Sequence, residues 1–359
     1  MVRGFFSFLM AAATVSAQHV YIGTAEKGIY VADFDEKSGK LSAPAIVSDT
    51  ASPSYLTISG KYLYAVNEVE KGAVTGFAME SGGKLKEINS ASVHSSGPCY
   101  IAIDKTGHVA ITANYSGGSI TVLPIDSNGR LGEPTDFIQN KGSGPNRDRQ
   151  TSPHPHWVGF IEKSKLVLVA DLGIDEVAIY NFNLKKGSLE VGNPAFMTIH
   201  PGSGPRHGVM HPSGKFFYLV NELSSEVMEF YFEAEPKRFT MVQKQSTLPE
   251  GFKGENTAAE IAVHPNGKFV YVSNRGDDSI MLYSVADMKR GTLKAEQHIS
   301  SGGKTPRQFE IDPSGHWLLV GNQGSDNIAI FSIDVSSGKL APSSMVSGVP
   351  KPTCIKFAK

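Results

Sequence analysis

Charged side chains recur at two fixed places in a repeating pattern along the chain. One place directly follows a proline that begins an apolar segment, and the other follows the polar residue that ends the next segment. These positions hold His156, Arg206, Arg307, Glu68, Glu222 and Arg275. A guanidinium group has the planar fork that binds carboxylate or phosphate, and an imidazole or a carboxylate can act as a general base. The set therefore suits chemistry on an anionic small molecule.

The apolar segments that must position these residues are short and alternate between apolar and polar residues. Six of them close on Asn or Asp, and they are YLYAVN, VAITAN, LVLVAD, FFYLVN, FVYVSN and WLLVGN, ending at residues 67, 114, 171, 221, 274 and 322. A seventh copy, HVYIGT, ends at Thr24. Each of the six follows a segment that usually begins with proline, such as PHWVGFI or PRQFEID. Alternation of this kind, bounded by Gly and Asx turns, indicates β-strands.

Repeats of about 50 residues with about four strands each are typical of a β-propeller. The sequence therefore predicts an all-β fold, a single seven-bladed propeller. The N-terminal repeat begins at HVYIGT and lacks its proline-led strand, whereas the C-terminal segment, residues 352–357, consists of that strand alone. We expect the C-terminal strand to join the N-terminal blade and close the ring, because this removes two open sheet edges.

The propeller geometry brings the charged positions together. The first strand of a blade lines the central channel and the second runs antiparallel beside it, so the start of one and the end of the other share a rim. A ring of salt bridges between blades would also use Glu and Arg there, but it explains the excess of Arg and His less well. Two long loops on this rim, residues 146–153 with Arg147 and Arg149 and residues 249–257, are either a substrate lid or tolerated insertions.

Three segments show a resemblance to a known family. GPRHGVMHPSGKFFYLVNE (204–222), AAEIAVHPNGKFVYVSNR (258–275) and PRQFEIDPSGHWLLVGNQ (306–323) resemble the seven-bladed β-propeller lactonases. That family includes bacterial 6-phosphogluconolactonase and fungal 3-carboxy-cis,cis-muconate lactonizing enzyme. The resemblance covers the chain from residue 18 and implies a lactone hydrolase that uses no metal or organic cofactor. The catalytic residues that it implies are His156, Arg206, Glu222 and Arg275. The expected substrate-binding residues are His154, which is also the alternative to His156, and His207, Glu68, Arg307 and Gln323.

Hydrolysis of a lactone requires a base that deprotonates water and donors that stabilise an oxyanion. We expect Glu222 or His156 to be the base. Arg206 and Arg275 are expected to hold the carbonyl oxygen and the anionic group of a sugar lactone, with Arg307 as a further clamp. Cycloisomerisation of a carboxymuconate by the same arginines is an alternative. A second alternative is a non-catalytic exported propeller that binds a protein or glycan at the rim, which predicts a flat surface with mutually paired charges.

Composition limits the partners. The 359 residues include 34 Lys plus Arg and 35 Asp plus Glu, so the formal net charge is −1. A protein that binds nucleic acid normally carries a basic surplus, so no nucleic-acid partner is expected. The expected partner is a small lactone or carboxylate, and the oligomeric state is left open.

The N-terminus is typical of an export signal. Arg3 precedes an apolar stretch over residues 4–13, and small residues follow up to Ala17. We expect residues 1–17 to be a cleaved signal peptide, residues 18–359 to be exported to the periplasm or the medium, and no membrane anchor to remain. Without cleavage the protein would stay in the cytoplasm. Two cysteines, Cys99 and Cys354, are too few for a disulfide framework, and we expect both thiols to be free and buried.

Overall fold

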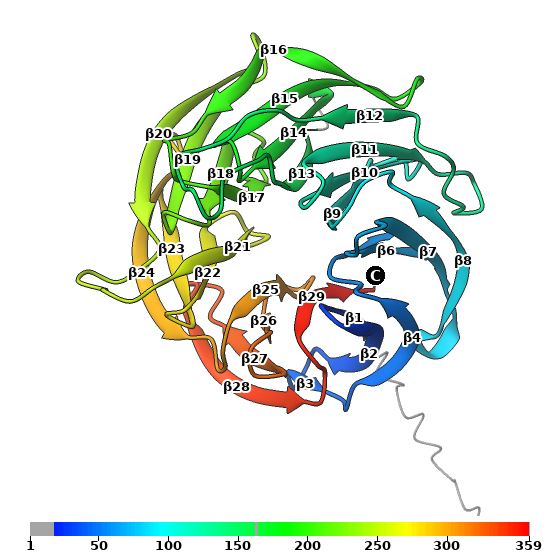
Figure 1. The fold of residues 1–359 in the computed structure, drawn as a ribbon. Coiled ribbons are helices and arrows are strands. Elements are labelled where there is room, and N and C mark those ends of the chain that lie inside the picture. The colour runs from blue at the N-terminus through cyan, green and yellow to red at the C-terminus, as the bar shows by residue number, and fades with distance from the viewer. Residues whose placement is uncertain (1–17, 162–163, 359) are drawn as a thin grey trace, which may run out of the picture.

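The computed structural model of the protein describes residues 18–161 and 164–358, and the expected signal peptide lies outside them. The described chain forms seven antiparallel sheets, arranged as blades around a central axis (Figure 1). The predicted seven-bladed propeller is therefore confirmed. Within the described ranges, no helix is long and apolar enough to cross a membrane.

Six blades contain four strands each, and the first strand in each lies nearest the axis (Figure 1). The first three of these blades are β5 (Leu56–Ser59), β6 (Tyr62–Asn67), β7 (Ala73–Met79) and β8 (Leu85–Ser92); β9 (Pro98–Ile103), β10 (Val109–Asn114), β11 (Ser119–Pro124) and β12 (Asp136–Gln139); and β13 (Pro155–Ile161), β14 (Leu166–Asp171), β15 (Glu176–Asn183) and β16 (Ser188–Thr198). A single turn of 3-10 helix, η1 (Ser81–Gly83), links β7 to β8.

The next three blades repeat this order. They are β17 (Pro205–Met210), β18 (Phe216–Asn221), β19 (Glu226–Glu233) and β20 (Arg238–Ser246); β21 (Thr257–Val263), β22 (Phe269–Arg275), β23 (Ser279–Asp287) and β24 (Thr292–Ser300); and β25 (Pro306–Ile311), β26 (Trp317–Asn322), β27 (Asn327–Ile333) and β28 (Leu340–Ser347).

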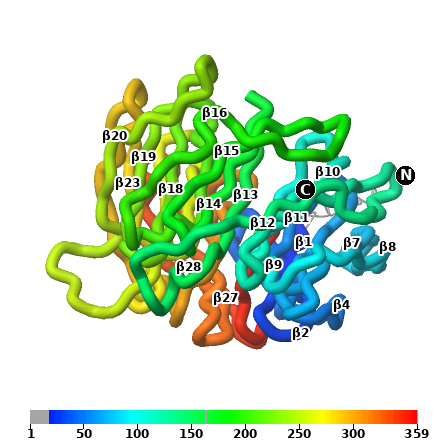
Figure 2. Tube along the Cα trace, turned by 45° about the horizontal axis from the view of Figure 1, so that its top comes forward, coloured from blue at the N-terminus to red at the C-terminus, as the bar shows by residue number. Residues whose placement is uncertain are grey.

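The remaining blade joins the two ends of the described chain. Its strands are β29 (Pro352–Phe357), β1 (Gln18–Thr24), β2 (Lys27–Asp35), β3 (Lys40–Leu41) and β4 (Ala45–Ala51). Both Figure 1 and Figure 2 show red β29 beside blue β1, and Ile355 pairs with Ile22 in the ladder between them. The predicted closure of the ring by the C-terminal strand is confirmed. The outer strand is split into β3 and β4, which both pair with β2, since Pro44 between them has no N–H to donate.

The core lies between neighbouring blades. The second strand of each blade is covered on both faces, so all six residues of β18 are buried, whereas the outer strand β20 alternates and is largely exposed. One apolar cluster packs Leu168 of β14 against Phe217 and Leu219 of β18. This packing holds the blades at fixed angles, and it therefore fixes the strand ends that carry the charged residues.

A β-bulge at the start of the inner strands aims the residue after the blade proline. In β17, Pro205 pairs with Asn221 and His207 with Val220, so Arg206 is the extra residue of the bulge. His156 in β13 and Arg307 in β25 are the extra residues of equivalent bulges. A bulge places two consecutive residues opposite one and redirects their side chains. The channel is consequently lined by both residues that follow each proline.

Candidate active site

A cavity of about 210 Å³ lies on the rim where the inner strands begin and the second strands end. Its lining residues are Glu68, Tyr115, Arg149, His156, Glu222, Arg275 and Arg307. Five of the nine predicted site residues are therefore in its wall: Glu68, His156, Glu222, Arg275 and Arg307. Arg206 and His207 lie beneath it and line a second cavity of about 10 Å³.

Glu222 is the hub of the rim. It directly follows β18, and its carboxylate forms ion pairs with three guanidinium groups. Arg149 Nη2 lies 2.6 Å from Oε1, while Arg206 Nε and Arg275 Nη2 lie 2.9 Å and 2.8 Å from Oε2. The three arginines come from a loop, an inner strand and the end of a second strand, so Glu222 ties together parts of the rim that are distant in sequence.

Burial and charge act against each other at this hub. Burial opposes ionisation of Glu222, but the positive charges of Arg275, Arg206 and Arg149 outweigh it and hold the pKa of the carboxyl group well below its usual range. Burial, together with the charge of Arg275, lowers the pKa of Arg206 to about 9 although Glu222 opposes the shift. Glu222 is therefore ionised at neutral pH, and it is a weak proton acceptor.

Arg307 differs from the other three arginines. It lines both cavities, and it forms no ion pair with any carboxylate of residues 18–161 and 164–358. Glu68, which also faces the rim cavity, is likewise outside every ion pair in that part of the chain. With Arg206 beneath, four arginines meet two carboxylates at this rim. The site therefore has a positive surplus and a guanidinium available to an anion.

His156 connects the two cavities. Its side chain lines both of them, and its Nδ1 is enclosed and meets no hydrogen-bonding partner among the residues that the structure describes. Burial, followed by the charges of Arg206 and the neighbouring imidazole and guanidinium groups, holds the pKa of His156 well below its usual range. The imidazole is thus neutral at pH 7, although burial makes it a weaker base than a free histidine. It has no ion-pair partner in residues 18–161 and 164–358, whereas three arginines occupy the carboxylate of Glu222.

Two predicted substrate-binding residues lie outside the walls of both cavities. His154 stacks on Tyr115 with ring centroids 4.4 Å apart, and its Nδ1 lies 2.9 Å from the Tyr115 carbonyl oxygen. It supports Tyr115, which does line the cavity. Gln323 uses its backbone N–H to bond Thr305. The structure does not bring the side chains of His154 and Gln323 into the cavity walls.

Sequence reasoning missed the roles of Arg149 and Tyr115. Arg149 Nη2 reaches both Glu222 and, at 3.3 Å, the Tyr115 hydroxyl. The signal was present in the extra length of the loop at residues 146–153, which we noted without choosing between its two arginines. Arg147 is exposed. The other long loop, residues 249–257, contributes nothing to the wall of the rim cavity.

Among the residues that the structure describes, no three His, Cys, Asp or Glu side chains are grouped so that they could hold a metal ion. Both cysteines are free and buried, as predicted. A neutral imidazole beside several guanidinium groups can deprotonate water and stabilise an oxyanion in one cavity.

The sequence and the fold are similar to those of known proteins. Residues 19–357 match the family model described as lactonase, 7-bladed β-propeller. A 6-phosphogluconolactonase of Bacillus subtilis is 33% identical over 346 residues, which cover 94% of this chain and 97% of that protein. The solved structure of a Pseudomonas aeruginosa periplasmic gluconolactonase is 31% identical, with a TM-score of 0.91 over 96% of this chain and 99% of that one.

Proposed function

The chain belongs to the seven-bladed β-propeller lactonase family, and we propose that it hydrolyses an anionic sugar lactone in the rim cavity. The resemblance expected from the repeats and the assignment as a lactone hydrolase are confirmed. The proposal goes further in naming the anionic substrate and the residues that act on it. The observation that carries it is Arg307, a guanidinium that faces the cavity and lacks a carboxylate partner in the described chain.

His156 is the general base in this proposal. Its imidazole takes a proton from a water molecule, the resulting hydroxide attacks the lactone carbonyl carbon, and the ring C–O bond breaks. The imidazolium returns the proton to the leaving ring oxygen, so the product is the open hydroxy acid. The neutral state of His156 at pH 7 and its place in the cavity wall support this role. Glu222 is the weaker choice because three arginines occupy its carboxylate.

The four arginines have different roles in this proposal. Arg307 binds the anionic group of the substrate, since no carboxylate in the part of the chain that the structure describes competes for it. Arg275 and Arg149 spend only part of their five N–H donors on Glu222, so their other donors are available to the carbonyl oxygen. Arg206 is 1% exposed and lies under the cavity, so it anchors Glu222 instead of touching substrate.

The non-catalytic alternative predicts a flat rim with mutually paired charges. The network around Glu222 fits that picture. The cavity does not, and neither do Arg307 and Glu68, which form no ion pair among the described residues. No observation favours cycloisomerisation over hydrolysis. The rim of this chain therefore supports hydrolysis of a bound anion better than docking of a protein or glycan.

A substrate screen tests the proposal. The purified protein is given a phosphorylated gluconolactone, the uncharged gluconolactone and a carboxymuconate, with acid release or absorbance as the readout. We expect acid release above the spontaneous rate, with the higher kcat/KM for the phosphorylated lactone. Turnover of the carboxymuconate alone, or of none of the three, would overturn the proposal.

We further propose that the protein is exported. The charged and apolar pattern of residues 1–17 supports this, and the similar Pseudomonas protein is described as periplasmic. Protein recovered from its host is then expected to begin near Gln18. Intact Met1 on protein from the cytosol would contradict export.

A further inference from the structure

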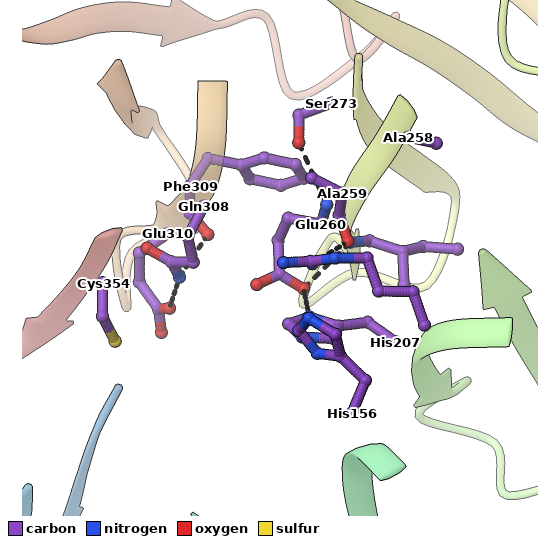
Figure 3. Close-up of polar contacts among 12 residues, drawn as sticks. His156, His207, Ala258, Ala259, Glu260, Ser273, Gln308, Phe309, Glu310 and Cys354 are labelled. Carbon is purple, nitrogen blue, oxygen red and sulfur yellow. Dashed lines mark hydrogen bonds and ion pairs between the residues drawn. The ribbon is translucent and has the colours of Figure 1, made fainter. Parts of the chain in front are cut away.

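A second ring of polar groups lies beneath the rim. His207 and Glu260 are the residues that follow the extra bulge residue in neighbouring blades, and both are buried in the channel. His207 Nδ1 lies 3.0 Å from Glu260 Oε1, as the dashed line in Figure 3 shows. The rings of His207 and His156 lie side by side with their centroids 5.1 Å apart.

Three buried polar atoms around the small cavity have no hydrogen-bond partner within residues 18–161 and 164–358. They are Ser54 Oγ, His156 Nδ1 and His207 Nε2. Polar atoms buried in this way are normally hydrogen-bonded, and each unsatisfied one carries a free-energy cost. The cavity of about 10 Å³ that these residues line has the room that one water molecule needs, with three polar partners around it.

We propose that one buried water bridges His156 Nδ1, His207 Nε2 and Ser54 Oγ, and that Glu260 thereby fixes the tautomer of His156. The residues Glu260, His207 and Ser54 are positioning residues in this assignment, because they reach the substrate only through His156. The assignment deepens the proposed hydrolysis and rests on it for its catalytic consequence.

The donor and acceptor roles along this path link Glu260 to the tautomer of His156. Glu260 Oε1 accepts the backbone N–H of Ile261 at 2.9 Å, so it is an acceptor, and His207 Nδ1 must carry the proton that points at it. Burial lowers the pKa of His207 to about 4 despite the nearby carboxylate, so this imidazole is neutral and its Nε2 is an acceptor. The water therefore donates a hydrogen to His207 Nε2.

In this assignment the second hydrogen of the water goes to Ser54 Oγ, which lines the same cavity and can accept. The water oxygen is then left to accept the Nδ1–H of His156. With its proton on Nδ1, His156 keeps the lone pair of Nε2 for the rim cavity, as a general base requires.

Two variants of Glu260 separate the loss of its negative charge from the loss of its hydrogen-bond acceptor. Glu260→Gln removes the negative charge but keeps an oxygen that accepts from Ile261 and His207, whereas Glu260→Met removes the acceptor at similar volume. Glu310→Gln is the matched control, since Glu310 accepts a hydrogen bond from Gln308 (Figure 3) and another from Lys356, and none from His207.

The readout is the ¹⁵N spectrum of the histidine side chains without substrate, which does not depend on any activity. In the wild-type protein we expect the Nδ1–H tautomer for both His156 and His207, with His156 assigned from the loss of its signals in His156→Gln. Glu260→Gln and Glu310→Gln should keep this pattern, and Glu260→Met should lose it at His156. A wild-type His156 with its proton on Nε2 would overturn the proposal even if Glu260→Met does not fold.

Kinetics and crystallography complete the test. Glu260→Met should lower kcat by about 10²-fold with KM little changed, the size expected for loss of a general base, while Glu260→Gln retains activity. A high-resolution crystal structure should show one water within hydrogen-bonding distance of all three atoms. If Glu260→Gln and Glu260→Met changed the His156 tautomer equally, the negative charge of Glu260 would set the tautomer, and the proposed path of hydrogen bonds through His207 and the water would be overturned. An inactive wild-type protein with the predicted tautomers would refute the proposed hydrolysis and leave the water bridge standing.

Discussion

Arg206 and Glu222, 16 residues apart, face each other across two paired strands of one blade, with Nε donating to Oε2 at 2.9 Å. Pro205 pairs with Asn221 at the ends of these strands, so Arg206 and Glu222 lie diagonally on either side of this pair, and the long side chain of the bulge residue Arg206 spans the distance. Both side chains are almost completely buried. The pair lies under the cavity. Because both charges are buried, the stability of the fold depends on each partner keeping the other.

Replacement of Glu222 by Gln should therefore destabilise the fold as well as reduce hydrolysis. It leaves buried Arg206 without its carboxylate, and breaking a buried pair in this way costs about 3–5 kcal/mol. Urea unfolding of the variant measures the loss. Glu226→Gln, which removes a partially exposed partner of Lys244, is the control and should change stability by less than about 1 kcal/mol. Reduced hydrolysis with undiminished stability would instead make Glu222 the general base.

Replacement of Arg307 by Gln should act on substrate binding alone. No ion pair within the described chain is lost, so Tm should be unchanged, whereas an anionic substrate loses a charge-assisted hydrogen bond of about 1.5–3 kcal/mol. KM for the phosphorylated lactone should rise by about 10- to 100-fold, with kcat little affected. Arg147→Gln, an exposed arginine of the neighbouring loop, is the control. An unchanged KM would remove Arg307 from the site.

Much of this rim could be predicted because one repeat unit supplies the register of every blade. The Asn or Asp that ends most second strands and the proline that begins most first strands predict the positions of Glu222, Arg275, His156 and Arg307. Ring closure followed from the same register, since residues 352–357 match the strand that is missing beside β1.

The register of the repeats does not predict how deep in the channel a side chain lies. A pleated strand would send consecutive side chains to opposite faces, but the bulge turns both Arg206 and His207 into the channel, so Arg206 became the floor of the cavity instead of its wall. Arg149 was missed for another reason. It sits on one of two inserted loops, and the extra length places the loop on the rim without indicating which of Arg147 and Arg149 would reach Glu222.

The buried carboxyl group of Glu229 should make the stability of the fold depend on pH, independently of the rim cavity. It is buried in β19, neither carboxyl oxygen meets a donor at good hydrogen-bonding geometry, and burial raises the pKa of Glu229 to about 8. The folded state keeps a proton that the unfolded state releases above about pH 4.5, so this contribution to stability is complete at low pH and is lost as the pH rises to about 8.

Glu229→Gln removes this dependence. Relative to the variant, the wild-type protein should lose about 1.4 kcal/mol of unfolding free energy per pH unit within that window, measured by urea unfolding from pH 5 to pH 8. Glu190→Gln changes an exposed glutamate in the same way and serves as the control. A constant difference between wild type and Glu229→Gln across the window would contradict the prediction.

Deletion of residues 352–359 should destabilise the whole ring. It removes β29, exposes the ladder edge of β1, and takes away the buried side chains of Cys354 and Ile355. Ile355→Ala is the milder variant and should cost about 2–5 kcal/mol. Thermal unfolding measures both, and an unchanged Tm after the deletion would show that the fold does not depend on the shared terminal blade.

The most direct test of the proposed active site is the rate of lactone hydrolysis by His156→Gln. If His156 is the base in the rim cavity, kcat should fall by about 10²–10⁴-fold while the variant stays folded with a similar Tm. A folded variant that hydrolyses the lactone at the wild-type rate would contradict this account and move the chemistry away from the rim.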